Sequence, residues 1–332
     1  MYRATDSYDN CAHLSDFVKY RLPGKSIVRV SGQFQPWNGQ KEGFLVADFL
    51  VRQPLILVPN SLNEPIEFQF STKIPQQTSY EEYMDQAHRI HQEIGAGFCE
   101  KVVLSRIKSL AYDPNFLLTD FERLCECYPS AFVYMVSSEK YGTWIGATPE
   151  LLLQNKGTHY QTVALAATKK KEDATDWTDK EYFEQGVVNE FILERLHALG
   201  CENIKSSNRH EVQAGPLKHL RNDITFESAA IPLERLVQSL HPTPAVSGLP
   251  QEKAVALIQH LEQHDRSLYA GVIGLVDEQS SSLFVNLRCA QVFEHAVCLY
   301  VGGGHTEASD ANAEWEETEN KAKTLLNILQ NH

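Results

Sequence analysis

The sequence predicts an α+β fold in a single domain, with large antiparallel sheets flanked by helices, from three observations. Its 332 residues can bury a large core, and 42% hydrophobic with 22% charged residues is typical of a globular chain. Strand-like runs fill the first half, and helical periodicity dominates three later segments. No internal repeat and no linker rich in Pro, Gly or Ser divides the chain, which favours one continuous domain.

The expected strands of the first half are short runs separated by turn residues or short helical stretches. They are SIVRVSG (26–32), EGFLVADFL (42–50), PLILVPN (54–60), EKVVLSR (100–106), AFVYMVSS (131–138), TWIGATPELLLQ (143–154) and YQTVALAAT (160–168). Apolar residues then recur with helical spacing over 178–199, 251–264 and 311–330. Between the last two helices we expect a second antiparallel set, made of GVIGLVD (271–277), SSLFVNLRCAQVF (281–293) and HAVCLYVGGG (295–304), with a hairpin turn at DEQSS (277–281).

Composition argues against several classes of function. The formal net charge of −13 disfavours a nucleic-acid surface, because phosphate binding needs clustered Lys and Arg. The N-terminus lacks a basic region followed by an apolar run, and no run of about eighteen apolar residues occurs, so we expect a cytoplasmic protein with no membrane partner. The seven cysteines lack zinc-like spacing and are expected to be reduced, mostly buried thiols.

Four glutamates fall within six residues of the segment 311–330. At about 100° per residue, Glu314, Glu317 and Lys321 share a flank beside the apolar stripe of this helix. Glu316 instead projects from the far side. Two of the four acids are therefore expected near the boundary of the core.

The segment 178–199 repeats this arrangement, because Glu181 and Glu184 continue its apolar face. Ionised groups beside apolar surroundings are costly unless they are paired or bound to a metal. Two helices that each offer an acidic pair could together hold Mg²⁺, which prefers oxygen ligands. Spacing alone leaves open the alternative that all four acids are solvated and favoured near helix starts by the macrodipole.

Eight segments of the chain occur in the order of a known family. They are KVVLSR (101–106), GATPELLL (146–153), TVALAAT (162–168), HPTPAVSGLP (241–250), DRSLYAGVIG (265–274), NLRCA (286–290), VGGG (301–304) and EWEETENK (314–321). Together they resemble the chorismate-utilising enzymes, and within them the isochorismate synthases of the menaquinone type. The resemblance implies a shortened, strand-rich part of the same fold over 1–78 and the chorismate-binding catalytic core over 79–332.

The resemblance implies a Mg²⁺-dependent isomerase that converts chorismate to isochorismate by adding water at C2 while the C4 hydroxyl leaves. Lys101 matches the base of the family, which must be neutral to act. Glu150 matches its general acid, which needs a pKa raised by burial. Taken singly, each residue has an ordinary alternative, namely a solvated lysine at a strand edge and a glutamate in a turn.

The family pattern makes Glu184 and Glu317 direct metal ligands. Glu181 and Glu314 would support them through water or hydrogen bonds. The other two glutamates of the segment 311–330 are then expected to face solvent.

The remaining site residues that the resemblance implies would bind the substrate. They are Thr168, His241, Arg288, Gly302, Gly303, Gly304 and Lys321. Arg288 would offer a fork to one carboxylate, Lys321 would contact the other, and the glycines would let backbone N–H groups approach the anion. The alternatives are an ion pair between Lys321 and Glu317, a glycine-rich turn, and a packed structural histidine at His241.

Three residues depart from the family pattern, namely Ala167 in place of a glycine, Ser247 in place of a glycine and His305 in place of an apolar residue. Each could reshape the site at a cost of about 1 to 3 kcal/mol. A non-catalytic chorismate-binding relative is therefore one alternative. Salicylate synthase, which goes on to eliminate pyruvate, is another.

Two other reactions of the family are disfavoured. Ala166 stands where an aminodeoxychorismate synthase would carry a lysine nucleophile. Anthranilate synthases usually carry Gln where this chain has Lys101, and no glutaminase segment is present. We expect a monomer that needs no glutaminase subunit, and the product could serve quinone, siderophore or other synthesis.

Overall fold

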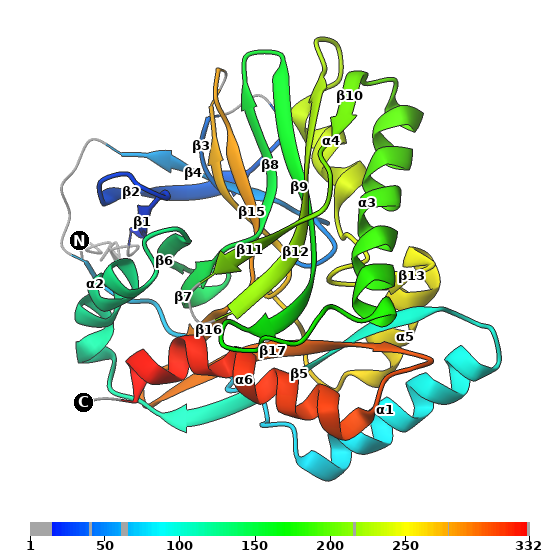
Figure 1. The fold of residues 1–332 in the computed structure, drawn as a ribbon. Coiled ribbons are helices and arrows are strands. Elements are labelled where there is room, and N and C mark those ends of the chain that lie inside the picture. Colours follow the sequence, from blue (N-terminus) through cyan, green and yellow to red (C-terminus); the bar gives the residue numbers. More distant parts are fainter. Residues whose placement is uncertain (1–14, 40–41, 61–65, 215–216, 278, 331–332) are drawn as a thin grey trace, which may run out of the picture.

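A computed structural model describes residues 15–39, 42–60, 66–214, 217–277 and 279–330 (Figure 1). Its strands pair antiparallel and belong to one hydrogen-bonded sheet system, around which the helices lie. The predicted α+β class with large antiparallel sheets is confirmed. The expected turn at 277–281 includes Glu278, which lies outside the described residues.

The elements follow one another along the whole chain. The first half contains β1 (Asp16–Arg21), β2 (Val28–Pro36), β3 (Gly43–Ala47), β4 (Leu55–Pro59), α1 (Tyr80–Gly95), β5 (Lys101–Ala111), η1 (Pro114–Phe116), α2 (Leu117–Cys127), β6 (Phe132–Ser138), β7 (Gly142–Thr148), β8 (Leu151–Lys156) and β9 (His159–Lys170). The second half contains α3 (Asp179–Leu199), β10 (Glu202–Ser206), β11 (His210–Ala214), β12 (Leu217–Glu227), α4 (Leu233–Leu240), β13 (Gly248–Leu249), α5 (Gln251–Leu261), β14 (Val272–Val276), β15 (Ser282–Val285), β16 (Cys289–Val292), β17 (Ala296–Thr306) and α6 (Ala311–Leu329).

The three predicted helices are present as α3, α5 and α6, but two predicted strands are each broken in two. The run 143–154 divides into β7 and β8 at Pro149 and Glu150, because proline has no N–H for a ladder hydrogen bond. The run 281–293 divides into β15 and β16 before Cys289, where Arg288 adopts a left-handed backbone with φ 49°. Each break places a charged side chain where a strand ends.

Helix α1 is longer than the short helical stretches that the sequence suggested, at 16 residues. Its N-cap Ser79 accepts a hydrogen bond from the backbone N–H of Glu82. The residues that it buries lie on one face, as in an amphipathic helix: Tyr83, Gln86, Ala87, Ile90 and Ile94. The sequence pattern could therefore have predicted α1. The elements α2, α4, β1 and β10 to β12 were also not among the predicted ones.

The two acid-bearing helices are held by different parts of the core. Helix α6 buries Leu325 and Leu329 in the same apolar cluster as Leu299 of β17, whereas α3 buries Phe191 and Leu196 in the larger cluster. Each fully buried side chain of this size stabilises the fold by about 1.5 to 3 kcal/mol. This packing fixes the acidic N-terminal turns of both helices over the same end of the sheet (Figure 1).

Helix α6 packs on β17, which pairs with β5, whereas α3 packs on β9. The antiparallel register of β5 and β17 sets Gly304 opposite Val103 and Thr306 opposite Lys101. Strand β9 pairs with β12, and the register shifts between His219 and Leu220. The residue left over in this bulge is Ala167, at φ 59°.

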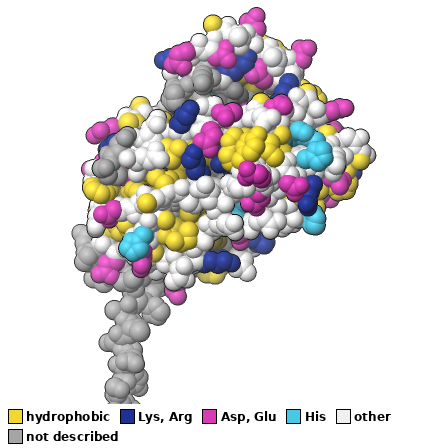
Figure 2. Space-filling model, turned by 90° about the horizontal axis from the view of Figure 1, so that it is seen from below, with side chains coloured by type: hydrophobic (Ala, Val, Ile, Leu, Met, Phe, Trp, Pro, Cys, Tyr) yellow, Lys and Arg dark blue, Asp and Glu magenta, His cyan; other side chains and the backbone are white. Residues whose placement is uncertain are grey.

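The surface, the helices and the cysteines each bear on an expectation from composition. On the face seen from below, Lys and Arg side chains lie among acidic ones and do not gather into a basic stripe (Figure 2). None of the described helices is long and apolar enough to cross a membrane. The described cysteines are free thiols, all buried except Cys127, and Cys11 lies outside the described residues.

Candidate active site

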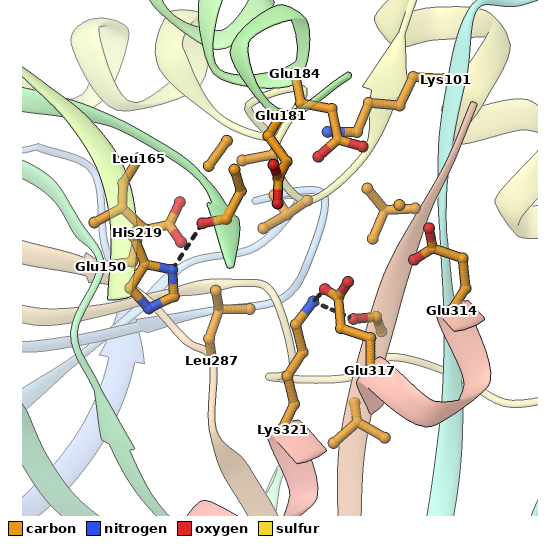
Figure 3. Close-up of a pocket in the computed structure, with 18 of the residues that line it drawn as sticks. Lys101, Glu150, Leu165, Glu181, Glu184, His219, Leu287, Glu314, Glu317 and Lys321 are labelled. Carbon is orange, nitrogen blue, oxygen red and sulfur yellow. Dashed lines mark hydrogen bonds and ion pairs between the residues drawn. The ribbon is translucent and has the colours of Figure 1, made fainter. Parts of the chain in front are cut away.

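A cavity of about 220 Å³ lies where α3 and α6 meet the ends of β5, β9 and β17 (Figure 3). It gathers most of the residues that the sequence assigned to a site. The assigned residues that line it are Lys101, Glu150, Glu181, Glu184, Arg288, Gly302, Gly304, Glu314, Glu317 and Lys321. Residues separated by more than 200 positions in the chain thus share one cavity.

Lys101 and Glu150 are both buried, with 5% and 7% of their surface exposed. Lys101 opens β5, and a side chain at Gly304 would come within 3.1 Å of its Cε. Glu150 lies between β7 and β8, where its carbonyl accepts a hydrogen bond from the N–H of Val285 at 2.9 Å. Burial raises the pKa of Glu150 from 4.5 to about 7, against the opposing charges of Lys321, Arg288 and Lys101. Its carboxyl can therefore carry a proton near neutral pH.

Lysines neutralise the acids that α3 and α6 bring into the cavity. The Lys180 ammonium lies 2.9 Å from Glu314 and 3.9 Å from Glu184, and the Lys321 ammonium lies 2.6 Å from Glu317. Burial raises the pKa of Glu314. Burial also acts to raise the pKa of Glu317, but the ammonium of Lys321 outweighs it, and the net shift is downward. Lys180 was not assigned from the sequence, although it lies one turn before Glu184.

Glu181 lines the cavity and also caps the N-terminus of α3. Its carboxylate accepts a hydrogen bond from the N–H of Thr178 at 2.6 Å, while the Thr178 hydroxyl accepts one from the N–H of Glu181. This capping box begins α3. Lys169 lies 3.2 Å from the same carboxylate.

The four carboxylates offer oxygen ligands of the kind that Mg²⁺ prefers. They face one cavity from two helices (Figure 3), but within the described ranges no three His, Cys, Asp or Glu side chains converge on one point. Mg²⁺ is usually held by one or two carboxylates together with waters and substrate oxygens. Glu184 and Glu317 supply such a pair, so the donor set fits this ion.

The glycines of β17 make room for site side chains. A Cβ at Gly302 would lie 2.8 Å from the Tyr269 hydroxyl, and one at Gly303 would lie 3.0 Å from the Glu314 carboxylate. The run is part of a paired strand, so it is not the glycine-rich turn left open by the sequence. Contact of its backbone N–H groups with an anion stays a prediction.

Arg288 and Lys321 both line the cavity and are both tied to neighbours. The Arg288 Nη1 donates to the hydroxyl of Thr324 at 3.0 Å and to the carbonyl of Lys321 at 3.3 Å. The Lys321 ammonium donates to the carbonyl of Gly302 at 2.8 Å in addition to its ion pair with Glu317. The ion pair that the sequence left as an alternative is therefore present.

His241 lies apart from most of the other predicted site residues, because it is not among the residues that line the cavity. It is buried, and its Nε2 lies 3.2 Å from the carbonyl oxygen of Phe49. Burial lowers its pKa to about 4, so the ring is neutral. The structure thus favours the packed histidine given as the alternative. Thr168 lies on β9, and its side chain is outside what the structure describes.

His219 and Tyr269 line the cavity although sequence reasoning assigned them no role. The Nδ1 of His219 donates to the carbonyl of Ala167 at 3.0 Å, and burial lowers the pKa of this histidine to about 4. A single histidine in a strand does not by itself predict that its side chain lines a cavity. Tyr269 stands in the family-like segment 265–274, which was the available signal.

The glutamates expected to face solvent behave differently from each other. Glu316 is exposed as predicted. Glu319 instead pairs with the buried guanidinium of Arg106 and with Lys108 at 2.5 Å, because a buried cation on β5 requires an anion.

Of the three departures from the family pattern, only Ala167 lines the cavity. The Ser247 hydroxyl donates to the carbonyl of Thr243 at 2.8 Å, within its own turn. His305 is buried with its Nε2 3.0 Å from the Tyr83 hydroxyl. Ala167 adopts the positive φ that a glycine would take without strain.

Comparison with known proteins shows the same relationship in sequence and in fold. A family model described as "Chorismate binding enzyme" matches residues 52–330. The isochorismate synthase EntC of Escherichia coli (strain K12) is 32% identical over 277 residues, which cover 78% of this chain and 69% of that protein. The structure of MenF, the menaquinone-specific isochorismate synthase from Escherichia coli, matches with a TM-score of 0.82 at 21% identity, over 96% of this chain and 89% of that one. The putative 2,3-dihydroxybenzoate-specific isochorismate synthase DhbC from Bacillus anthracis matches with a TM-score of 0.79 at 23% identity, over 95% and 96%.

Proposed function

The chain belongs to the chorismate-binding enzyme family, and we propose that it is an isochorismate synthase, an isomerase that converts chorismate to isochorismate. Relatives named for different end products, among them menaquinone, vibriobactin and 2,3-dihydroxybenzoate, share this one reaction in their names. The observation that carries the proposal is the placement of a buried lysine and a buried, proton-bearing carboxyl on one cavity. A non-catalytic binder would not require that pair.

In this proposal Lys101 and Glu150 divide the proton transfers. Lys101 takes a proton from the water whose oxygen bonds to C2 of chorismate. Glu150 gives its proton to the C4 hydroxyl, which leaves as water while the ring double bonds shift. The pKa of about 7 for Glu150 suits this task, because a general acid works best with a pKa near the working pH.

The charges around the cavity suit a dianionic substrate in an acidic protein. Arg288 and Lys321 bring positive charge to the cavity of a chain with net charge −13. We propose that Arg288 and Lys321 hold the carboxylates, with Lys321 exchanging its contact with Glu317 for one with the substrate. A Mg²⁺ ion held by Glu184 and Glu317 would add positive charge against a substrate carboxylate.

The test is direct. Purified protein incubated with chorismate and Mg²⁺ should yield isochorismate by chromatography, and absence of this product would refute the proposal. Release of pyruvate in the same assay would instead indicate a salicylate synthase. Mg²⁺-dependent chorismate binding by calorimetry without turnover would indicate the non-catalytic relative. A cytoplasmic, monomeric protein without a glutaminase subunit remains the expectation from the sequence.

A further inference from the structure

We infer that Lys180 is the internal cation of the acidic cluster: its ammonium bridges acids of α3 and α6, competes with a divalent cation for them, and so lowers the affinity for that ion. The inference deepens the proposed function, because it takes Glu184 and Glu317 as the metal-binding pair. It concerns how this chain's own lysine competes for the site.

The contacts of Lys180 distinguish it from the other lysines of the cavity. Its ammonium lies 2.9 Å from Glu314 of α6 and 3.9 Å from Glu184 of α3. Lys321 pairs with Glu317 of its own helix, four residues away. Of these two lysines, only Lys180 therefore neutralises acids on both helices. Its contact with Glu314 joins residues that are 134 positions apart in the chain.

The position of this ammonium conflicts with a bound divalent cation. An ion coordinated by Glu184 would lie about 2.0 to 2.1 Å from its carboxylate oxygen. The Lys180 ammonium is 3.9 Å from an oxygen of the same carboxylate. The two cations would then lie at most about 6 Å apart, where like charges repel in a partly buried site, so a bound ion works against the present position of the Lys180 ammonium.

A second cavity borders Lys180 and could receive its ammonium. It has a volume of about 710 Å³, and Lys180 lines both cavities. Acidic residues Glu100, Asp179 and Glu307 line this second space. In this inference, the side chain of Lys180 turns towards the second cavity and its acids when a divalent cation binds.

Lys180→Met tests the inference by removing the charge while keeping the length of the side chain. Isothermal titration calorimetry with MgCl₂, without chorismate, would compare it with the wild-type protein. We expect Mg²⁺ to bind at least tenfold more tightly to Lys180→Met, since the competing cation is gone. Lys180→Arg keeps the charge and should keep the wild-type affinity.

Lys253→Met is the matched control. Lys253 lines the second cavity, and its ammonium lies over the ring of Phe98 at 5.0 Å rather than beside the glutamate cluster. Its replacement should change the affinity for Mg²⁺ far less than Lys180→Met does, because its charge does not lie between Glu184 and Glu314. In the Glu314→Gln background, Lys180→Met should gain less than in the wild-type background, because the main partner of the ammonium is already neutral.

Equal or weaker Mg²⁺ binding by Lys180→Met would overturn the inference, as would an equal gain in Lys253→Met. If Lys180→Met does not fold by circular dichroism, Lys180→Gln takes its place with the same expected gain. An unchanged affinity together with a raised KM for chorismate would also overturn it, because Lys180 would then bind the substrate. The assay for isochorismate is a separate measurement on the wild-type protein. If Lys180→Met binds Mg²⁺ more tightly but the wild-type protein makes no isochorismate, this inference stands and the proposed function is refuted.

Discussion

Burial of Glu150 predicts that replacing it with glutamine stabilises the protein above neutral pH. The pKa of this carboxyl rises from 4.5 to about 7 in the fold, chiefly through desolvation. A shift of one pKa unit corresponds to about 1.4 kcal/mol, so the folded state favours the protonated form by about 3 kcal/mol. Glutamine keeps the shape and cannot ionise.

The raised pKa of Glu150 determines how the stability of the protein changes with pH. Because the folded-state pKa lies above the unfolded value, the stability associated with the protonated carboxyl is fully present below about pH 4.5 and is lost as the pH rises through about 7. Glu150→Gln does not undergo this loss. Its advantage over the wild-type protein should be below about 1 kcal/mol at pH 5 and should approach 3 kcal/mol at pH 8.

Urea denaturation followed by tryptophan fluorescence at pH 5, 6, 7 and 8 measures this difference. The control is Glu316→Gln, the same change at an exposed glutamate of α6, which should stay within about 0.5 kcal/mol of the wild-type protein. A difference between Glu150→Gln and wild type that does not change with pH would refute the reasoning. So would a variant that is less stable at pH 8. The same variant should lose turnover if Glu150 is the acid.

Three further predictions address the base, the metal and the backbone. Lys101→Ala should abolish isochorismate formation while calorimetry still detects Mg²⁺-dependent chorismate binding, and equal loss of both would mean that its role is misassigned. Glu317→Gln should weaken the affinity for Mg²⁺ more than it lowers the stability of the fold. If the activity depends on Mg²⁺ as it does in the wild-type protein, Glu317 is not a ligand. Ala167→Gly should stabilise the protein by up to about 1 kcal/mol in thermal unfolding, because it relieves the positive φ of 59°, whereas Ala164→Gly on the same strand should destabilise it by about the same amount. Destabilisation by Ala167→Gly would contradict the strain argument.

Local patterns predicted a large part of this protein. The α+β class, the helices α3, α5 and α6, and the acidic faces of α3 and α6 follow from spacing within ten to twenty residues. The same patterns failed at Pro149 and at Arg288, where strands end. Both breaks lie at the cavity, where they contribute Glu150 and Arg288 to the lining.

The sequence alone determined which residue types are available, namely an acidic pair on each of two helices, a lysine at the start of β5 and a glutamate after Pro149. Only the tertiary structure decided how they pair and ionise. It placed Lys180 against Glu314, buried His241 outside the cavity and withdrew Glu150 from water. The physical reason is that periodicity is set by neighbours along the chain, whereas desolvation and ion pairing depend on groups that only the folded sheet brings together.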